Sequence, residues 1–190
     1  MKKKLGYESL YRVNPLTNHV IIDIALDYYL EFFHEWDNAA FKKRDMHPDL
    51  AKFLDICSSD IPLRRSLDIM FCIKDGSIDT EKETLIIESF KNYFKSQERA
   101  EAKKLKRTLL FGSSLFLIAI LLLLVYVIDK AQRQSGVLPA LFLEGLLIGG
   151  WVFMWEALHM FFFESLEPFL RRKEIRRFLQ ASLLFRMSNV

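Results

Sequence analysis

The chain has 190 residues, of which 51% are apolar or aromatic and 27% are charged. This composition is too apolar for a disordered chain, and the length allows one domain, or one small domain plus further segments. Residues 1–90 carry 12 basic and 16 acidic side chains, residues 91–107 carry seven basic and two acidic ones, and residues 108–128 carry none. This uneven distribution excludes a plain soluble globule, and the acidic first part argues against nucleic acid as a partner.

Residues 1–100 are predicted to form a small α+β domain. Residues 20–26 (VIIDIAL) are apolar and β-branched, which predicts a buried strand. Asp27 then suits the N-cap of a helix, although the same segment would also suit a second strand. The aromatic residues that such a helix would place on one face are Tyr29, Phe32, Phe33 and Trp36.

The next predicted elements are a helix that opens at Pro48, a strand over 67–73, and a long helix. The first of these helices would bury Leu50, Phe53, Leu54 and Cys57. Thr80 and Glu83 fit a capping box at the start of the long helix, which should continue unbroken into the apolar run. Two strands make a poor sheet alone, so they need other strands or a neighbouring subunit.

Residues 108–128 form the first predicted membrane span. The run TLLFGSSLFLIAILLLLVYVI contains no charged residue, and about 20 residues of helix cross the roughly 30 Å hydrocarbon layer. Its position in the middle of the chain excludes a signal peptide. We therefore expect a transmembrane helix here.

A second, less uniform apolar segment covers about residues 138–160. It contains Glu144 near one end and Glu156 with His159 near the other. Ionisable groups are costly at the centre of a bilayer but are tolerated near the ends of a span, where they reach the headgroups. The short polar linker DKAQRQSG (129–136) separates the two segments, so a helical hairpin is predicted.

The basic residues predict the orientation of this hairpin. Positive side chains stay in the cytoplasm, so we expect a bacterial inner-membrane protein with both termini in the cytoplasm. The predicted parts are the α+β domain (1–100), the stalk end with the hairpin (101–163), and an amphipathic tail at the inner headgroup level (164–190). The flanking basic residues are Lys103, Lys104, Lys106, Arg107, Arg171, Arg172, Lys173, Arg176 and Arg177.

Polar residues that might carry catalysis concentrate between Asn14 and His47. A hydrolase or nuclease needs carboxylates and histidines that converge to bind a metal or activate water. The sequence contains no HExxH, GxSxG, P-loop or GxGxxG motif, so the first interpretation is capping and solvent-facing side chains, without cofactor or metal. The alternative is a membrane-tethered, metal-dependent hydrolase or nuclease that uses His19, Asp23, His34, Asp37 and His47.

One face of the second span also stands out. Gly145 and Gly149 form a GxxxG pattern and, at 100° per residue, share a face with Glu156 and His159. Such a face permits close packing against the first span or against the same helix of neighbouring subunits. In the second case Glu156 and His159 would recur around a ring. The Glu156-x-x-His159 spacing also matches bundle metal sites, but those need ligands from several helices.

Three segments carry a resemblance to known sequences: HEWDNAAFKKRD (His34–Asp45), PDLAKFLDICSSDIP (48–62) and EGLLIGGWVFMWEAL (Glu144–Leu158). The chain resembles a group of uncharacterised small bacterial membrane proteins over most of its length. The resemblance implies a cytoplasmic N-terminal domain and a two-helix hairpin, and it implies no activity.

These observations lead to a hypothesis of a non-enzymatic membrane protein. The cytoplasmic domain would sense or recruit a protein partner, while the hairpin would anchor the chain in the lipid bilayer and form a homo-oligomer. A sharper version is a pore or membrane-disrupting effector, which needs a homo-oligomer because two spans enclose nothing alone. The alternatives are the tethered hydrolase and an accessory subunit of a larger membrane complex.

Overall fold

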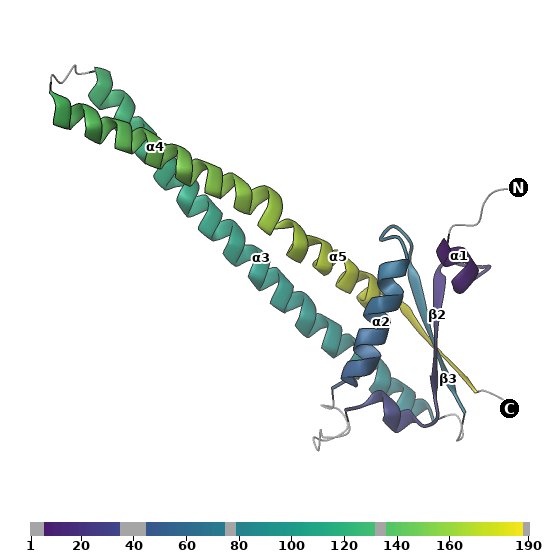
Figure 1. Cartoon of the computed structure of the whole chain (residues 1–190). Coiled ribbons are helices and arrows are strands. Elements are labelled where there is room, and N and C mark those ends of the chain that lie inside the picture. Colours follow the sequence, from purple (N-terminus) through teal and green to yellow (C-terminus); the bar gives the residue numbers. More distant parts are fainter. Residues whose placement is uncertain (1–5, 35–44, 75–78, 132–135, 188–190) are drawn as a thin grey trace, which may run out of the picture. The chain divides into compact units, whose positions relative to one another are not determined.

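The computed structural model describes residues 6–34, 45–74, 79–131 and 136–187 (Figure 1). It has a mixed α+β fold that is mostly helical and contains one four-stranded sheet. The chain divides into two compact units. We call Met1–Arg99 together with Lys173–Val190 the sheet unit, and Ala100–Arg172 the hairpin unit.

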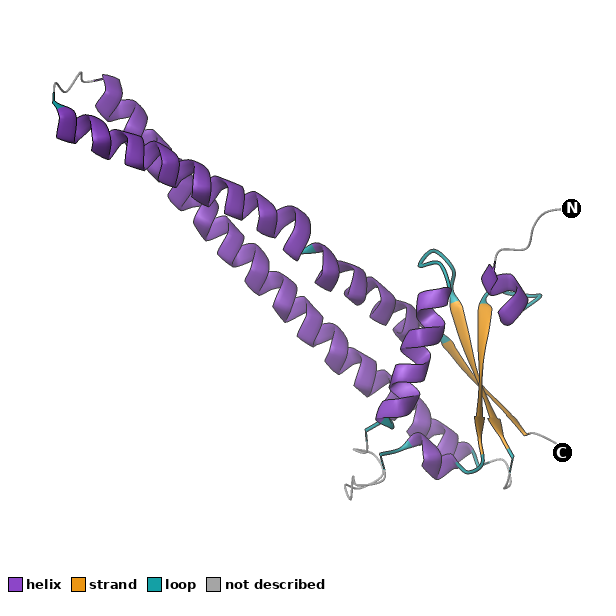
Figure 2. Ribbon diagram, viewed as in Figure 1, coloured by secondary structure: helices purple, strands orange, loops and turns teal. Residues whose placement is uncertain are grey.

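The strands of the sheet unit are paired in the order β1-β2-β3-β4. Figure 2 draws the strands in orange. The short β1 is antiparallel to β2, while β2, β3 and β4 are mutually parallel. The predicted strands 20–26 and 67–73 are confirmed as β2 and β3, whereas the two strands that flank them in the sheet were not predicted. The bounds are β1 Arg12–Val13, β2 Val20–Leu26, β3 Leu67–Ile73 and β4 Ser182–Met187.

The helices confirm two local predictions. One helix opens at Pro48, and another runs without a break from Thr80 through the apolar run 108–128. The bounds are α1 Gly6–Leu10, the 3-10 turn η1 Tyr29–Phe32, α2 Pro48–Asp60, α3 Thr80–Ala131, α4 Val137–His159, the π-helical turn η3 Met160–Glu164 and α5 Leu166–Gln180.

One face of the sheet carries the hydrophobic core. Alternate residues of β2 and β3 point into it, because side chains alternate between the two faces of a strand. Two crossovers, β2 to β3 and β3 to β4, add strands in the same direction, and right-handed crossovers then place their helices on the same face. The buried helix residues of the core are Ala51, Leu54, Cys57, Ile86, Phe90, Phe94, Ile175 and Phe178.

The C-terminal region differs from the amphipathic tail that the sequence suggested. Residues from Lys173 onward group with the sheet unit, and β4 pairs in parallel with β3 through residues such as Phe185, which lies opposite Phe71. Phe178 of α5 stacks on Phe94 of α3 at 4.6 Å between ring centroids. The missing strands of the predicted sheet therefore come from the same chain, and 108 residues separate the end of β3 at Ile73 from the start of β4 at Ser182.

Arg177 lies in the core rather than at a lipid headgroup. It is 6% exposed, and its guanidinium donates to the carbonyl oxygens of Ser58 (2.7 Å), Ile61 (3.0 Å) and Pro62 (3.0 Å) and to the Ser58 hydroxyl. Burial lowers the pKa of Arg177, whereas the charge of Glu174 opposes that shift. The carbonyl groups at the end of an α-helix lack partners within the helix, and Arg177 supplies donors at the end of α2.

The segment after β2 does not form the predicted helix. Tyr29–Phe32 is a single 3-10 turn, and Phe33 leaves it in extended conformation to form an isolated bridge with Met46. Tyr29, Phe32 and Phe33 are nevertheless buried, so their spacing reflects burial on the core rather than a helical face. Trp36 lies outside the described residues.

Two smaller expectations are corrected. In α2, Leu54 and Cys57 are buried as predicted, but Phe53 is 44% exposed and Ala51 faces the core instead. At the start of α3, the cap is Asp79 rather than Thr80. The Asp79 carboxylate accepts hydrogen bonds from the backbone N–H groups of residues 81 and 82, and its bond with the Lys82 side chain lowers its pKa.

Candidate functional site

The four described residues of the alternative hydrolase site, His19, Asp23, His34 and His47, do not converge on one place. His19 precedes β2 and His34 follows it, so seven strand residues, about 20 Å, lie between them. Asp23 lies midway along β2, where its carboxylate pairs with Arg12 (Nε to Oδ2, 3.0 Å). Asp37 lies outside the described residues.

His34 and His47 are the one pair of these residues that the described part of the chain brings into contact. Their rings stack with 5.9 Å between centroids, because the backbone N–H of His34 donates to Asp45 and that of His47 donates to Phe32. The Nδ1 atom of His47 accepts from the backbone N–H of Asp49 at 3.2 Å. His47 therefore caps α2, which is a structural role.

A buried carboxylate that the sequence analysis missed lies at the other end of the sheet. Asp68 of β3 is 1% exposed and interacts with the Nδ1 atom of His19 (2.8 Å), the amide of Asn14 (3.0 Å) and the hydroxyl of Thr17 (3.4 Å). The sequence feature that could have revealed Asp68 is a charged residue inside the otherwise apolar strand LDIMFCI. In open sheets, ligands bind outside the carboxyl ends of parallel strands. Asp68 lies near the amino end, so we interpret the cluster as a clamp on the β1–β2 turn.

We expect Asp68→Ala to lower the free energy of unfolding by about 2–3 kcal/mol, because three polar groups lose a buried acceptor. The measurement is thermal unfolding of the full chain in detergent. Asp23→Ala is the matched control, since its exposed pair with Arg12 contributes about 0–1 kcal/mol. Equal losses for the two variants would contradict the proposed clamp.

In the hairpin unit, the structure adds a third residue to the predicted Glu156 and His159. Residues five apart in an α-helix point about 140° away from each other. The π-helical turn η3, in which the N–H of Ser165 donates to Met160, widens the helix and brings Glu164 within 4.0 Å of the Nδ1 atom of His159.

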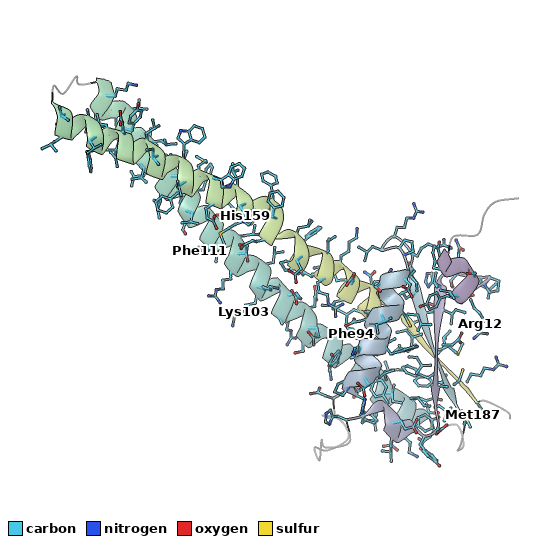
Figure 3. The ribbon with its side chains drawn as sticks, in the orientation of Figure 1. Arg12, Phe94, Lys103, Phe111, His159 and Met187 are labelled. Atoms are coloured by element: carbon cyan, nitrogen blue, oxygen red, sulfur yellow. The ribbon has the colours of Figure 1, made fainter. Side chains whose placement is uncertain are left out.

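Ligand atoms of Glu156, His159 and Glu164 all lie within 4.8 Å of one another, and all three side chains are exposed. One imidazole nitrogen and two carboxylate oxygens form a donor set that suits a divalent first-row cation. The position of His159 near the end of α4 can be followed in Figure 3.

The glycines of the predicted face are not the ones that lie closest to α3. A Cβ atom at Gly145 would meet nothing within 4 Å, and one at Gly149 would meet only Leu122 at 3.8 Å. The close contact is at Gly150 instead, where a Cβ atom would lie 2.8 Å from the side chain of Leu123. Ala119, whose carbonyl oxygen would lie 3.5 Å from that Cβ atom, is fully buried, and so is Ala157 two turns further along α4.

Both long helices have the length and composition of membrane spans. The segments Thr80–Ala131 and Val137–Gln180 are long and apolar enough to cross a bilayer, and 11% and 6% of their most apolar windows are buried. Large apolar side chains on them point outward, including Leu117 (68% exposed) and Trp155 (72%). Comparisons with family models, with curated proteins and with solved structures yield no match for this sequence.

Proposed function

We propose that this chain is a non-enzymatic integral membrane protein of the bacterial inner membrane. Its sheet unit would lie in the cytoplasm and recognise a protein partner, and the helices α3 and α4 would form a two-span anchor. The observation that carries this proposal is the parallel pairing of β4 with β3.

This pairing constrains the number of membrane crossings. The chain leaves the sheet unit after β3 and must return to the same unit to add β4. Because one sheet lies on one side of a bilayer, the intervening residues cross the membrane an even number of times. In this proposal the apolar segments of α3 and α4 supply two crossings, and the basic residues on both flanks support a cytoplasmic sheet unit.

The exposed apolar surface supports a bilayer as the surrounding medium. Burial of apolar surface is worth roughly 25 cal/mol per Å², and soluble proteins rarely expose contiguous apolar patches above a few hundred Å². The outward side chains of α3 and α4 extend along both helices, among them Leu121, Leu124, Phe142, Trp151 and Trp155. Lipid hydrocarbon removes this surface from water without further protein contacts.

The glycine face of α4, on which Gly145 is exposed and Gly149 half-buried, supports the homo-oligomeric part of the proposal. Because Gly150 rather than Gly145 packs against α3, the GxxxG face remains available to the same helix of another subunit. Glu156, His159 and Glu164 lie near the end of α4 and would recur around the axis of such an assembly. The pore version of the proposal requires this arrangement.

The membrane topology can be tested by labelling with a membrane-impermeant maleimide. In a Cys57→Ala/Cys72→Ala background, we expect Ser135→Cys to react in intact spheroplasts, because the linker lies outside. We expect Lys3→Cys and Asn189→Cys to react only after permeabilisation. Labelling of these two positions from opposite sides, or of all three from the outside, would overturn the topology.

A further inference from the structure

A groove between α3 and α5 lies where the charged part of the hairpin unit gives way to the apolar part. It has a volume of about 340 Å³. On α3 the cationic Lys106 is followed by the apolar Leu109 and Leu110, and Ser113 lies about 10 Å beyond Lys106 along the helix axis. The lining residues are Ala102, Leu105, Lys106, Leu109, Leu110, Ser113 and Arg172.

The chemistry of this groove matches one class of ligand. Lys106 from α3 and Arg172 from α5 place two cationic side chains at its lining, and Arg is suited to bidentate binding of phosphate oxygens. Leu105, Leu109 and Leu110 supply an apolar wall beside them. A molecule that joins an anionic phosphate to hydrocarbon within about 10 Å satisfies both parts.

The neighbouring surface extends the same pattern around α3. A second groove shares Lys106 and Leu110 and adds the cations Lys103 and Arg107, with Phe111 as an apolar wall. Figure 3 labels Lys103 and Phe111 on this helix. The acidic residue Glu167 does not line either groove. It lies 3.7 Å from Lys104, which is also outside both grooves. The charge lining both grooves is therefore positive, which favours a net anionic headgroup over a zwitterionic one.

We propose that the groove between α3 and α5 binds the phosphate of an anionic glycerophospholipid between Lys106 and Arg172. The first methylenes of the lipid would lie against Leu109 and Leu110. This inference rests on the proposed membrane insertion and adds a defined lipid site to it. Each basic side chain near an anionic membrane surface strengthens binding by about fivefold. Removal of both cations should therefore weaken lipid binding strongly.

The test is native mass spectrometry of the full chain in mixed micelles that contain phosphatidylglycerol or phosphatidylcholine. For the unmodified chain we expect retention of phosphatidylglycerol and little phosphatidylcholine. For Lys106→Gln/Arg172→Gln we expect the apparent Kd for phosphatidylglycerol to rise roughly tenfold or more. Lys104→Gln is the control and should change the Kd by less than about twofold, because Lys104 lies outside the grooves and its charge is already paired with Glu167 at 3.7 Å.

Three results would overturn the lipid site. They are equal retention of the two lipids, an unchanged Kd in the double variant, and complete displacement of phosphatidylglycerol by millimolar inorganic phosphate, which would show a phosphate site without lipid specificity.

Unchanged thermal unfolding of the double variant shows that its fold is intact. Extraction of membranes with sodium carbonate separates the two proposals. Release of the chain without detergent overturns membrane insertion, whereas retention in the membrane with no lipid selectivity overturns only the groove.

Discussion

Replacing Arg177 with alanine is expected to lower the free energy of unfolding of the sheet unit by about 3 kcal/mol or more. Hydrogen bonds that involve a charged donor contribute about 1.5–3 kcal/mol each, and a buried carbonyl left without a donor costs a further 1–3 kcal/mol. Arg177 serves three carbonyl oxygens and the Ser58 hydroxyl while it is 6% exposed. Since domains are stable by only about 5–15 kcal/mol, the loss should be evident.

Arg176→Ala is the matched control for this prediction. Arg176 is the adjacent residue of α5, and its exposed side chain pairs with Glu98 at 2.8 Å. An exposed ion pair contributes about 0–1 kcal/mol. The difference between the two variants is measured by thermal unfolding in detergent. The rate of proteolysis in the segments next to β4 gives a second measurement. If Arg176→Ala destabilises the chain as much as Arg177→Ala does, the hydrogen bonds at the end of α2 do not account for the loss of stability.

Replacing Gly150 with leucine is expected to destabilise the hairpin by about 2 kcal/mol, because added atoms in a packed interface force the neighbours apart. A Cβ atom at position 150 already lies 2.8 Å from Cγ and Cδ2 of Leu123 and 3.5 Å from the carbonyl oxygen of Ala119. The measurement is unfolding in mixed micelles with an increasing fraction of sodium dodecyl sulfate, followed by tryptophan fluorescence.

Gly145→Leu is the control within the same helix. A side chain at Gly145 enters open space, so the stability of the hairpin should not fall. The mass of the detergent-extracted particle, measured by light scattering with bound detergent subtracted, should fall to that of a monomer if the GxxxG face joins subunits. A monomeric unmodified chain would end the homo-oligomer and pore proposals. A fall in hairpin stability for Gly145→Leu that equals that of Gly150→Leu would contradict the packing described for α4.

The candidate site was only partly predictable. Glu156 and His159 follow from helical periodicity, which is a local property of the sequence. Glu164 does not, because an ideal α-helix would point it away from His159 and only the π-helical turn returns it to the same side. Gly150 was missed for a similar reason. Its neighbour Leu123 lies on another helix, so the sequence spacing of glycines indicated Gly145 and Gly149 instead.

The sequence alone determined the features that depend on neighbouring residues. Pro48 opens α2, the β-branched run Val20–Leu26 forms a strand, and the uncharged residues 108–128 continue one long helix. Each follows from local sterics or from the cost of exposing apolar side chains to water, which residues close together in the chain decide.

The tertiary structure alone decided which segments build the domain. β4 completes the sheet from the far end of the chain, Arg177 binds the end of α2, and Asp68 gathers His19, Asn14 and Thr17. Pairing between strands and hydrogen bonds to a buried charge depend on distance in space, and they carry no periodic signal along the chain. For this reason the residues after α4 resemble a basic tail in the sequence, whereas their last segment, β4, forms an edge of the sheet in the folded protein.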